Sequence, residues 1–536
     1  MELSRILNAL EDPSVYPHAA DDLRIVHTHA SAVVLVGDHV YKLKKPVDFG
    51  FLDYSTLARR QAMCRAEVEW NRRLAPDVYL GVVPITLQDG RIALDGGGEI
   101  VEYAVHMQRL PDAATWSARL AAGTLDRALI ERVGHVVAEF HRGAGRGQDV
   151  ARWAAFEAVR QHCHENFRAL EPYADVVAPR MEFMRLELMT EAALQDQRAR
   201  IERRREEGIP CETHGDLRLE HVYALPDGRI RIVDCVEFSD SLRCADPVSD
   251  IAFLAMDLRA HGAWSEADIL LESYFQAVGD EDGRALVPVY VAYRSTVRAK
   301  VRALQAVASD MPEAQRARAM QLARAHVQLA VVALSEPEDR PCLVLVGGLP
   351  GTGKSVLSRG LAARADFHWL RADAIRKELA GLDPLAPGGS AVRTGIYTQA
   401  WNERTYAECL SRAKELLFSG RRVLVDASFK EDARRLAFVD AAREWGVPVR
   451  ILECTSAPEL VKDRLAHRTG DPSDADWKIY EHVRATWDEF SARTAAVHER
   501  IDTSGSPEES LDQALRVLTV CGLAAVPRAE RARSDA

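Results

Sequence analysis

The sequence predicts a mixed fold, with an α+β region towards the N-terminus and an α/β region in the C-terminal third. Three observations lead to this prediction. Residues from about 24 to 110 read as strands around one helix, and residues from about 115 to 335 read mainly as helices. Beyond 341, strand-like and helix-like segments alternate. Such alternation is typical of a parallel sheet with helices on both faces.

The N-terminal strands are predicted from short apolar runs. Val33–Val36 and Val40–Leu43 are separated by Gly37 and Asp38, which is a hairpin signal. The segment Thr56–Leu74 is rich in Arg, Ala and Glu and predicts a helix. Together these segments indicate a small antiparallel sheet with one long helix.

The middle of the chain carries few strand signals. Ile100–Met107 predicts the last strand of the N-terminal region, and only short strand-like pieces near Val222–Tyr223 and Ile230–Val233 follow it. The polar segment 335–341 contains two prolines and follows a long Ala- and Arg-rich helical stretch. We place the domain boundary there, which predicts domains 1–335 and 340–525 and a disordered tail at 526–536.

The C-terminal region shows the alternating pattern most clearly. Four apolar runs predict parallel strands: Cys342–Val346, His368–Leu370, Arg422–Val425 and Val449–Glu453.

Composition narrows the possible functions. The formal charge of −11 and the pI of about 5.9 give the chain no overall basic character, which disfavours tight duplex nucleic-acid binding. No apolar run reaches membrane-spanning length, and the first residues lack the pattern of a signal peptide. The nine cysteines include no CxxC pair, which indicates reduced thiols in a cytoplasmic protein. The lack of a membrane-spanning apolar run predicts that the protein has no membrane partner.

A phosphate-binding loop follows the first C-terminal strand. The motif G-x-x-x-x-G-K-[ST] is complete and is followed by helix-forming sequence; its residues are Gly348, Leu349, Pro350, Gly351, Thr352, Gly353, Lys354 and Ser355. Backbone N–H groups of such a loop cradle phosphates at a helix N-terminus. Lys354 is expected to reach the β- and γ-phosphates, and the Ser355 hydroxyl to help hold Mg²⁺.

Two carboxylates are candidates for the chemistry beside this loop. Asp426 ends a predicted strand and is a candidate to orient Mg²⁺, the alternative being a simple turn residue at the strand end. Asp373 follows another short strand and is a candidate to accept a proton from an acceptor hydroxyl. The alternative for Asp373 is a helix N-cap, and the two roles are compatible.

A basic helix precedes the segment RTGDPSDAD. Arg464 and Arg468 are four residues apart and share one helix face, near Lys462. Two guanidinium groups on one face could clamp a transferring phosphate, whereas the alternative is a solvated basic surface.

The region 340–520 resembles small P-loop kinases, which include polynucleotide 5′-hydroxyl kinases, gluconate-type kinases and zeta-toxin-like kinases. The resemblance lies in GGLPGTGKS, in D-x-x-R at Asp373 and Arg376, in VLVDASF and in KDRLAHR. It implies that Asp373 is the general base, that Arg376 contacts substrate or phosphate, and that Arg464 and Arg468 are lid residues. The P-loop is the most specific of these motifs.

A second pair of carboxylates lies in the N-terminal region. The motif His214-Gly215-Asp216 is followed by a hairpin signal and then by Asp234 at the end of a strand-like run. Kinase-type phosphoryl transfer needs one carboxylate that accepts or orients the hydroxyl proton and another that binds the metal ion. A loop Asp and a strand-end Asp joined by a short hairpin would bring both to one cleft.

This segment resembles the aminoglycoside phosphotransferase family, a branch of the two-lobed protein-kinase-like fold. The resemblance covers about 20–330 and implies that Asp216 is the catalytic base and Asp234 the main metal ligand. The family pattern H-G-D-x-x-x-x-N departs here at His221, which stands in place of the Asn. An imidazole is a softer ligand than an amide oxygen, so Mn²⁺ is an alternative to Mg²⁺. A cationic His221 that binds phosphate, or a weakened site, would also fit this substitution.

The same resemblance requires a strand lysine for the nucleotide phosphates and a helix glutamate to orient it. Lys42 is our choice and Lys44 the close alternative; Glu67 is the expected partner, with Glu69 second. Val101–Met107 would form the hinge strand. The whole chain is similar to an uncharacterised subgroup in which a phosphotransferase-like domain is fused to a P-loop kinase-like domain.

These patterns together predict an ATP-dependent kinase with two nucleotide sites, which transfers γ-phosphate to hydroxyl groups of small molecules. The C-terminal domain would act on a separate acceptor or on the product of the first domain. Three different functions stay open: an N-terminal nucleotide-sensing pseudokinase, a C-terminal polynucleotide 5′-hydroxyl kinase, and an antibiotic-modifying kinase.

Overall fold

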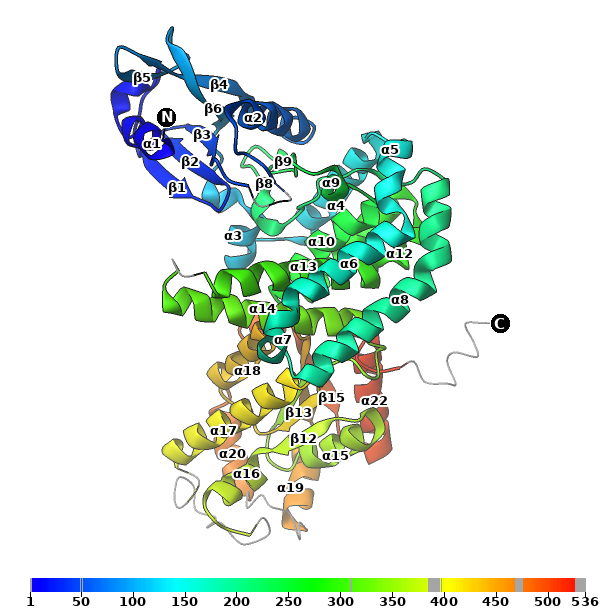
Figure 1. Ribbon diagram of the computed structural model, residues 1–536. Coiled ribbons are helices and arrows are strands. Elements are labelled where there is room, and N and C mark those ends of the chain that lie inside the picture. Colours follow the sequence, from blue (N-terminus) through cyan, green and yellow to red (C-terminus); the bar gives the residue numbers. More distant parts are fainter. Residues whose placement is uncertain are drawn as a thin grey trace. The chain divides into compact units, whose positions relative to one another are not determined.

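The mixed fold class is confirmed: the chain contains a curled antiparallel sheet and a separate parallel sheet, each accompanied by helices (Figure 1). The computed structural model describes residues 2–48, 50, 52–308, 311–383, 396, 398–467 and 476–525. The predicted tail at 526–536 lies outside the described residues. No helix among the described residues is long and apolar enough to cross a membrane.

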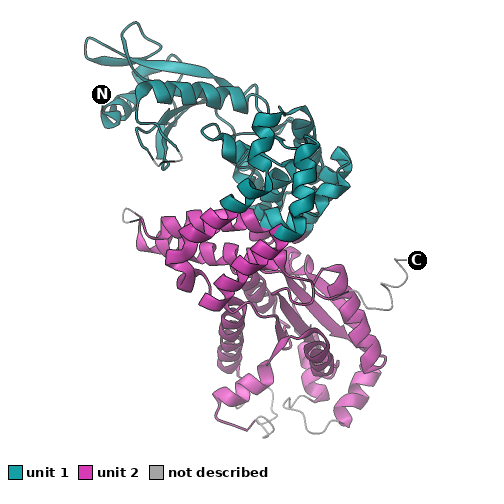
Figure 2. Cartoon of the chain, turned by 45° about the vertical axis from the view of Figure 1, so that its right-hand side comes forward, with its two compact units in different colours: residues 1–162, 195–258, 265–291 teal, residues 163–194, 259–264, 292–536 magenta. Residues whose placement is uncertain are grey.

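The chain divides into two compact units (Figure 2). Unit 1 comprises residues 1–162, 195–258 and 265–291, and unit 2 comprises residues 163–194, 259–264 and 292–536. The division places helix α14, Glu313–Leu334, in unit 2. Val332 of α14 packs in the core beneath the parallel sheet, and Gln321 Nε2 donates to the carbonyl of Glu444 at 3.0 Å. The domain boundary at 335–341 stays a prediction.

The antiparallel sheet of unit 1 has six strands in the order β1-β2-β3-β6-β4-β5. The strands are β1 Arg24–His27, β2 Ser31–Val36, β3 His39–Lys44, β4 Tyr79–Gln88, β5 Arg91–Leu94 and β6 Glu99–Gln108. The predicted hairpin is present, because β2 and β3 pair from Val36 opposite His39 across Gly37 and Asp38.

Side chains of a strand alternate between the two faces of the sheet, so both faces carry apolar residues. One helix packs on each face. Helix α1, Leu3–Leu10, packs on the face that carries Tyr41 and Leu43. Helix α2, Leu57–Asn71, packs on the opposite face, which carries Val105. Thr56 caps α2, since its hydroxyl accepts from the Arg59 N–H at 3.3 Å.

The rest of unit 1 is helical and holds two small two-stranded sheets. The short strands β7 Cys211–Glu212 and β10 Cys244–Ala245 pair, as do β8 Val222–Ala224 and β9 Ile230–Ile232. The helices that lie wholly or partly in unit 1 after the sheet are α3 Trp116–Ala121, α4 Arg127–Gly143, α5 Gln148–Ala151, α6 Phe156–Leu170, α8 Arg180–Glu206, α9 Asp240–Arg243, α10 Pro247–Ala260, α11 Trp264–Val278, α12 Glu281–Arg284 and α13 Val287–Ala306. Short 3₁₀ turns of unit 1 occur at Pro13–Val15, Asp112–Ala114, Arg152–Ala154 and Leu219–His221, and one of unit 2 at Glu171–Tyr173.

The parallel sheet of unit 2 has five strands in the order β12-β13-β11-β14-β15. They are β11 Leu343–Gly348, β12 His368–Arg371, β13 Val423–Asp426, β14 Val449–Thr455 and β15 His498–Asp502. Four match predicted runs. The fifth, β15, was not predicted, because only Ile501 of its five residues is buried and the segment HERID has no apolar pattern.

Helices cover both faces of the parallel sheet, as the alternation predicted. Leu343 and Leu345 of β11 face one core, whereas Val344 and Val346 face the other. The helices of unit 2 are α7 Ala174–Val177, α14, α15 Lys354–Ala365, α16 Ala372–Leu379, α17 Gln399–Phe418, α18 Asp432–Glu444, α19 Pro458–Ala466, α20 Trp477–Ala485, α21 Ala492–Ala495 and α22 Pro507–Val520, with parts of α6, α8, α10, α11 and α13. Polar residues of a candidate site lie at the ends of β11 and of the strands next to it.

Candidate functional sites

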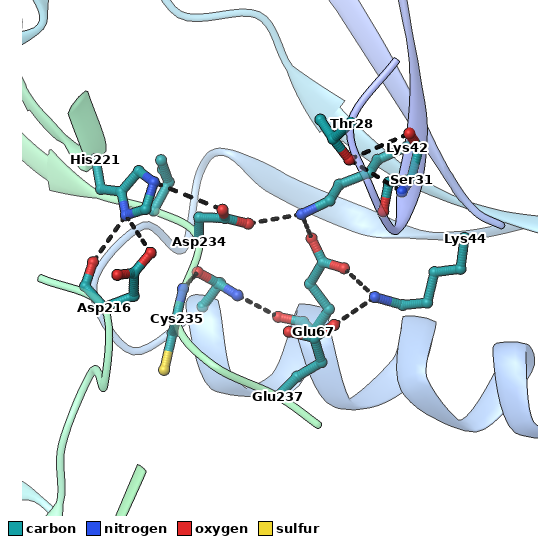
Figure 3. A network of polar contacts seen from close by, with 12 residues as sticks. Thr28, Ser31, Lys42, Lys44, Glu67, Asp216, His221, Asp234, Cys235 and Glu237 are labelled. Carbon is teal, nitrogen blue, oxygen red and sulfur yellow. Dashed lines mark hydrogen bonds and ion pairs between the residues drawn. The ribbon is translucent and has the colours of Figure 1, made fainter. Parts of the chain in front are cut away.

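Lys42 of β3 lies between two carboxylates in unit 1 (Figure 3). Its Nζ is 2.8 Å from Oε1 of Glu67 on α2 and 2.6 Å from Oδ1 of Asp234, which follows β9. Burial opposes the charged form of Lys42, but the carboxylates of Asp234 and Glu67 outweigh it and raise the pKa of Lys42 well above its ordinary value. The structure thus brings together three residues predicted from separate parts of the sequence.

Lys44, the alternative lysine, contacts the other oxygen of the same glutamate. Its Nζ is 2.7 Å from Oε2 of Glu67 and also pairs with Glu237, which accepts from the Tyr54 hydroxyl at 2.7 Å. Lys44 is buried, whereas 17% of the Lys42 side chain is exposed. Of the two lysines, Lys42 is the one that contacts Asp234.

Both carboxylates that contact Lys42 are held in their ionised form. Burial would raise the pKa of Glu67, but the ammonium groups of Lys42 and Lys44 outweigh it and lower that pKa. Burial likewise opposes the ionised form of Asp234, and Lys42 and then His221 lower its pKa far below the ordinary value. Asp234 is nevertheless 45% exposed, so its carboxylate is accessible to a ligand.

A buried carboxylate holds the loop that carries Asp216. Asp250 on α10 accepts from the backbone N–H of His214 at 2.8 Å and of Gly215 at 3.0 Å. Gly215 has φ +82°, and a Cβ there would lie about 3 Å from Val236 and from the Leu242 carbonyl. Only glycine suits this position, which explains the His-Gly-Asp order.

His214 is a structural member of this loop. Its Nε2 donates to the Val233 carbonyl at 2.9 Å, and its Nδ1 lies 3.3 Å from the Asp216 N–H, so the neutral form fits both contacts. Burial lowers the pKa of His214 to about 4. His214 thereby links the loop that carries Asp216 to the backbone just before Asp234.

Asp216 and Asp234 both face His221. The imidazole Nδ1 is 2.8 Å from the carbonyl oxygen of Asp216 and 3.7 Å from its Oδ2, and Nε2 is 3.6 Å from Oδ2 of Asp234. His221 lies at the end of a 3₁₀ turn whose first N–H, that of Leu219, donates to Asp257 at 2.9 Å. The two candidate carboxylates are therefore bridged by the residue that departs from the family pattern.

Arg218 was missed as a site residue. Its guanidinium makes two hydrogen bonds to Asp216, from Nε to Oδ1 at 2.9 Å and from one terminal nitrogen to Oδ2 at 3.0 Å. The same terminal nitrogen lies 3.2 Å from Nε2 of His221. An Arg two residues after an Asp is a weak signal, because such pairs are common on surfaces.

In unit 2 the P-loop joins β11 to α15. Gly348, Gly351 and Gly353 have φ of +139°, +76° and +83°, which side chains rarely adopt. A Cβ on Gly348 would lie 2.5 Å from the Cys454 carbonyl. Lys354 Nζ donates to the Leu349 carbonyl at 2.9 Å, across the mouth of the loop. These glycines shape the concave backbone that an anion needs.

Asp426 ends β13 next to the P-loop strand, opposite Val346. Its side chain is 6% exposed, and within the described part of the chain Oδ2 has no hydrogen-bond partner. Arg371 Nε lies 4.0 Å from Oδ2, too far for a hydrogen bond. Burial raises the pKa of Asp426, and Lys354 and Ser355 act against that shift. A buried carboxylate oxygen of this kind, close to Ser355, suits a bound divalent cation.

Asp373 and Arg376 lie one turn apart at the start of α16. Arg376 donates to Oδ1 of Asp373 at 2.9 Å and to Oδ1 of Asn402 on α17 at 3.0 Å. Asp373 is 33% exposed, whereas Arg376 is almost buried. The N-cap of α16 is Arg371, and Asp373 lies in the first turn. Asn402 was not predicted.

Of the basic residues on α19, Arg464 is linked to the P-loop through Thr503. Arg464 donates to the Thr503 carbonyl at 2.7 Å, and the Thr503 hydroxyl donates to the carbonyl of Thr352 in the loop at 2.7 Å. Lys462 stacks on Trp477, with 5.5 Å between Nζ and the ring centroid. Arg468 lies outside the described residues.

Metal ligands were predicted at both sites, and neither site forms a conventional cluster. Among the described residues no group of three or more His, Cys, Asp or Glu side chains is arranged to hold a metal ion. Asp234, and Asp426 with Ser355, each provide a partial ligand set, whereas both ring nitrogens of His221 have partners in Asp216 and Arg218.

Comparisons with known proteins cover both units. A family model described as "AAA domain" matches residues 343–495. "Uncharacterized protein Rv2004c" of Mycobacterium tuberculosis (strain ATCC 25618 / H37Rv) is 32% identical over 495 residues, which cover 91% of this chain and 94% of that protein. "Uncharacterized protein Mb2027c" of Mycobacterium bovis (strain ATCC BAA-935 / AF2122/97) matches with the same identity and coverage.

Two solved structures are also similar to parts of the chain. A choline/ethanolamine kinase family protein from Mesorhizobium loti is 15% identical with a TM-score of 0.34, over 60% of this chain and 98% of that chain. A gluconokinase from Sinorhizobium meliloti 1021 is 18% identical with a TM-score of 0.26, over 34% of this chain and 94% of that chain.

Proposed function

The chain belongs to the protein family of these mycobacterial relatives, and we propose that it is an ATP-dependent phosphotransferase with two nucleotide sites. Each site would transfer the γ-phosphate to a hydroxyl group of a small molecule. The observation that carries the proposal is the position of Lys42, whose ammonium group lies 2.8 Å from Glu67 and 2.6 Å from Asp234. The P-loop of unit 2 independently supports a second site.

In the N-terminal site, Lys42 would bind the α- and β-phosphates while Glu67 holds its ammonium group in place. Asp216 would orient the acceptor hydroxyl and accept its proton. Asp234, with His221 beside it, would hold a divalent cation, Mg²⁺ or Mn²⁺. Lys44 does not bind nucleotide in this scheme, because its ammonium group is buried against Glu67 and Glu237.

In the C-terminal site, backbone N–H groups of Gly351, Gly353, Lys354 and Ser355 would cradle the phosphates, and the Lys354 side chain would contact the β- and γ-phosphates. The Ser355 hydroxyl and Asp426 would hold Mg²⁺, which offsets the charge that develops on the phosphate oxygens. Oδ2 of Asp426, which accepts no hydrogen bond from the described residues, supports this assignment.

The acceptor side of the C-terminal site would lie over α16. Asp373 is exposed enough to reach a hydroxyl and would act as general base. Arg376, held by Asn402 as well as by Asp373, would contact the acceptor or the transferring phosphate. Arg464, together with Arg468, would close over the phosphates as lid residues.

The test is transfer of labelled γ-phosphate from ATP by the full chain, with Mg²⁺ or Mn²⁺ present. The acceptors are a pool of small metabolites and, separately, oligonucleotides with a 5′-hydroxyl end. Asp216→Asn and Asp373→Asn are compared with Asp227→Asn and Asp440→Asn, which change exposed carboxylates that pair with Arg229 and Arg493.

Label on a metabolite that is lost with Asp216→Asn or Asp373→Asn assigns that site as a small-molecule kinase. Label on the oligonucleotide that is lost only with Asp373→Asn would make unit 2 a polynucleotide kinase instead. Nucleotide binding without labelled acceptor in any reaction would contradict the proposal and favour a regulatory ATP-binding protein.

A further inference from the structure

The guanidinium of Arg218 sits among groups that accept hydrogen bonds or carry negative charge. It contacts both carboxylate oxygens of Asp216, at 2.9 and 3.0 Å, and lies 3.2 Å from Nε2 of His221. It also forms an ion pair with Glu220. Arg218 is 12% exposed, so these contacts use most of its donors. The surroundings of this guanidinium are those expected around a bound cation.

The contacts of His221 define which of its ring nitrogens carries the proton. Nδ1 lies 2.8 Å from the Asp216 carbonyl oxygen, which only accepts, so Nδ1 must donate. Nε2 faces a guanidinium nitrogen at 3.2 Å, which only donates, so Nε2 must offer its lone pair. Both ring nitrogens of His221 are therefore engaged, Nδ1 by Asp216 and Nε2 by Arg218. Its lone pair is directed to Arg218.

This arrangement changes the expected metal content of the site. Kinase-type transfer uses two metal ions, and the second is held by the Asn that follows the catalytic Asp in the loop. In this chain that position is His221, and its available nitrogen is already engaged by a fixed positive charge. A divalent ion bound at Asp216 and His221 would have to displace Arg218 or lie directly beside it, which Coulomb repulsion disfavours.

We infer that Arg218 takes the place of the second metal ion in the N-terminal site, which therefore binds a single divalent ion, at Asp234. His221 then acts as a positioning residue that holds Arg218, and Arg218 supplies the positive charge beside Asp216. The inference rests on the proposed phosphotransferase function of this site. It accounts for the His in place of Asn and gives a role to Arg218, which stands at a position that the family pattern leaves unspecified.

The test counts Mn²⁺ ions bound by the full chain, using electron paramagnetic resonance of free Mn²⁺ in the presence of adenylyl imidodiphosphate. Lys354→Ala and Ser355→Ala are introduced together to suppress the P-loop site, and Asp234→Asn gives the baseline for the N-terminal site. In this background we expect one ion per chain that Asp234→Asn removes. Replacing Arg218→Gln together with His221→Asn should raise the number to two.

Matched variants separate charge from folding. Arg218→Lys keeps a cation and should leave the number at one, as should Arg229→Gln, which changes an arginine paired with Asp77 and Asp227 outside the site. Two ions in the parent, or one ion in the double variant with its circular dichroism unchanged, would overturn the inference. No ion at the N-terminal site despite bound nucleotide would instead overturn the proposed function and the inference with it.

Discussion

Lys44 and Glu67 form an ion pair of 2.7 Å in which both side chains are almost fully buried, at 1% and 0% exposure. The pair occupies one oxygen of Glu67 and turns the other towards Lys42, 2.8 Å away. Two lysines on one strand thus have different tasks. Lys44 is an internal counter-charge, and Lys42 is the cation at the edge of the site.

Exchanging each lysine for methionine should separate these tasks. We expect Lys44→Met to destabilise unit 1 by about 3–5 kcal/mol, because Glu67 and Glu237 would lose a buried partner. Lys42→Met should cost less stability, since Glu67 keeps Lys44 and Asp234 is half-exposed, but it should weaken nucleotide binding strongly. Hydrogen exchange of the β3 amides and nucleotide titration measure the two effects. Equal destabilisation by both variants would contradict the assignment.

A substitution that inactivates one nucleotide site should leave nucleotide binding at the other site intact. Lys354→Ala removes the ammonium group that closes on the P-loop, so transfer at the C-terminal site should fall by about 100-fold or more. Nucleotide binding at the N-terminal site should remain, because its lysine, glutamate and aspartate all lie in unit 1. Titration calorimetry of the full chain should show one binding event lost. Lys414→Ala, at an exposed ion pair with Glu444, is the control, and loss of both events in Lys354→Ala would contradict independent sites.

Sequence reasoning succeeded where the information is local. The hairpin at Gly37 and Asp38 needs a two-residue turn between apolar strands, and the P-loop needs glycines at fixed spacing followed by a helix. Both signals consist of residues that are consecutive in the sequence. The strand β15 was missed because it is an edge strand in which only Ile501 needs to be apolar.

The polar networks depend on contacts between distant segments, which sequence patterns do not report. Glu237 contacts Lys44 from a segment almost two hundred positions away, and Asn71 of α2 accepts the Cys235 N–H at 2.8 Å. Arg218 is close to Asp216 in sequence, yet its role depends on the loop conformation that Gly215 and Asp250 impose. The identities of Lys42, Glu67, Asp216 and Asp234 as catalytic groups remain predictions, although the structure brings them to one place.

Asp426 should lower the folding stability of unit 2 at neutral pH while it supports the binding of Mg²⁺. Burial raises its pKa, so the folded state holds a proton more tightly than the unfolded state. This carboxyl therefore favours folding at low pH, and its contribution is lost as pH rises through the folded pKa. At neutral pH, Asp426→Asn should stabilise unit 2 by about 1–2 kcal/mol, because it removes a buried charge whose Oδ2 receives no donor from the described residues.

The same variant should lose the response to Mg²⁺ at the C-terminal site. Chemical denaturation monitored by hydrogen exchange of β11 and β13, with and without Mg²⁺ and nucleotide, measures both effects. Asp440→Asn, an exposed carboxylate on α18, should change neither. A destabilised Asp426→Asn protein that still responds fully to Mg²⁺ would show that Asp426 is a structural residue.

His214 should make unit 1 sensitive to mild acid. Its pKa is about 4 in the folded chain because burial disfavours the charged form, whereas an unfolded histidine titrates near its ordinary value of about 6.5. Above pH 6.5 both states are neutral and stability is unaffected. As pH falls from 6.5 to 4, only the unfolded state takes up the proton, so stability should fall by up to about 3 kcal/mol.

The His214 share of this effect is the difference between the parent and His214→Gln, whose amide can still donate to the Val233 carbonyl. His106, whose pKa is also lowered to about 4 by burial and then by His39, contributes separately to unit 1. We expect His214→Gln to flatten the slope of unfolding free energy against pH between 6.5 and 4, while His135→Gln, at an exposed position, leaves it unchanged. If His214→Gln kept the full slope, the acid sensitivity would have to arise from other groups, and the neutral His214 would no longer account for how the Asp216 loop is held.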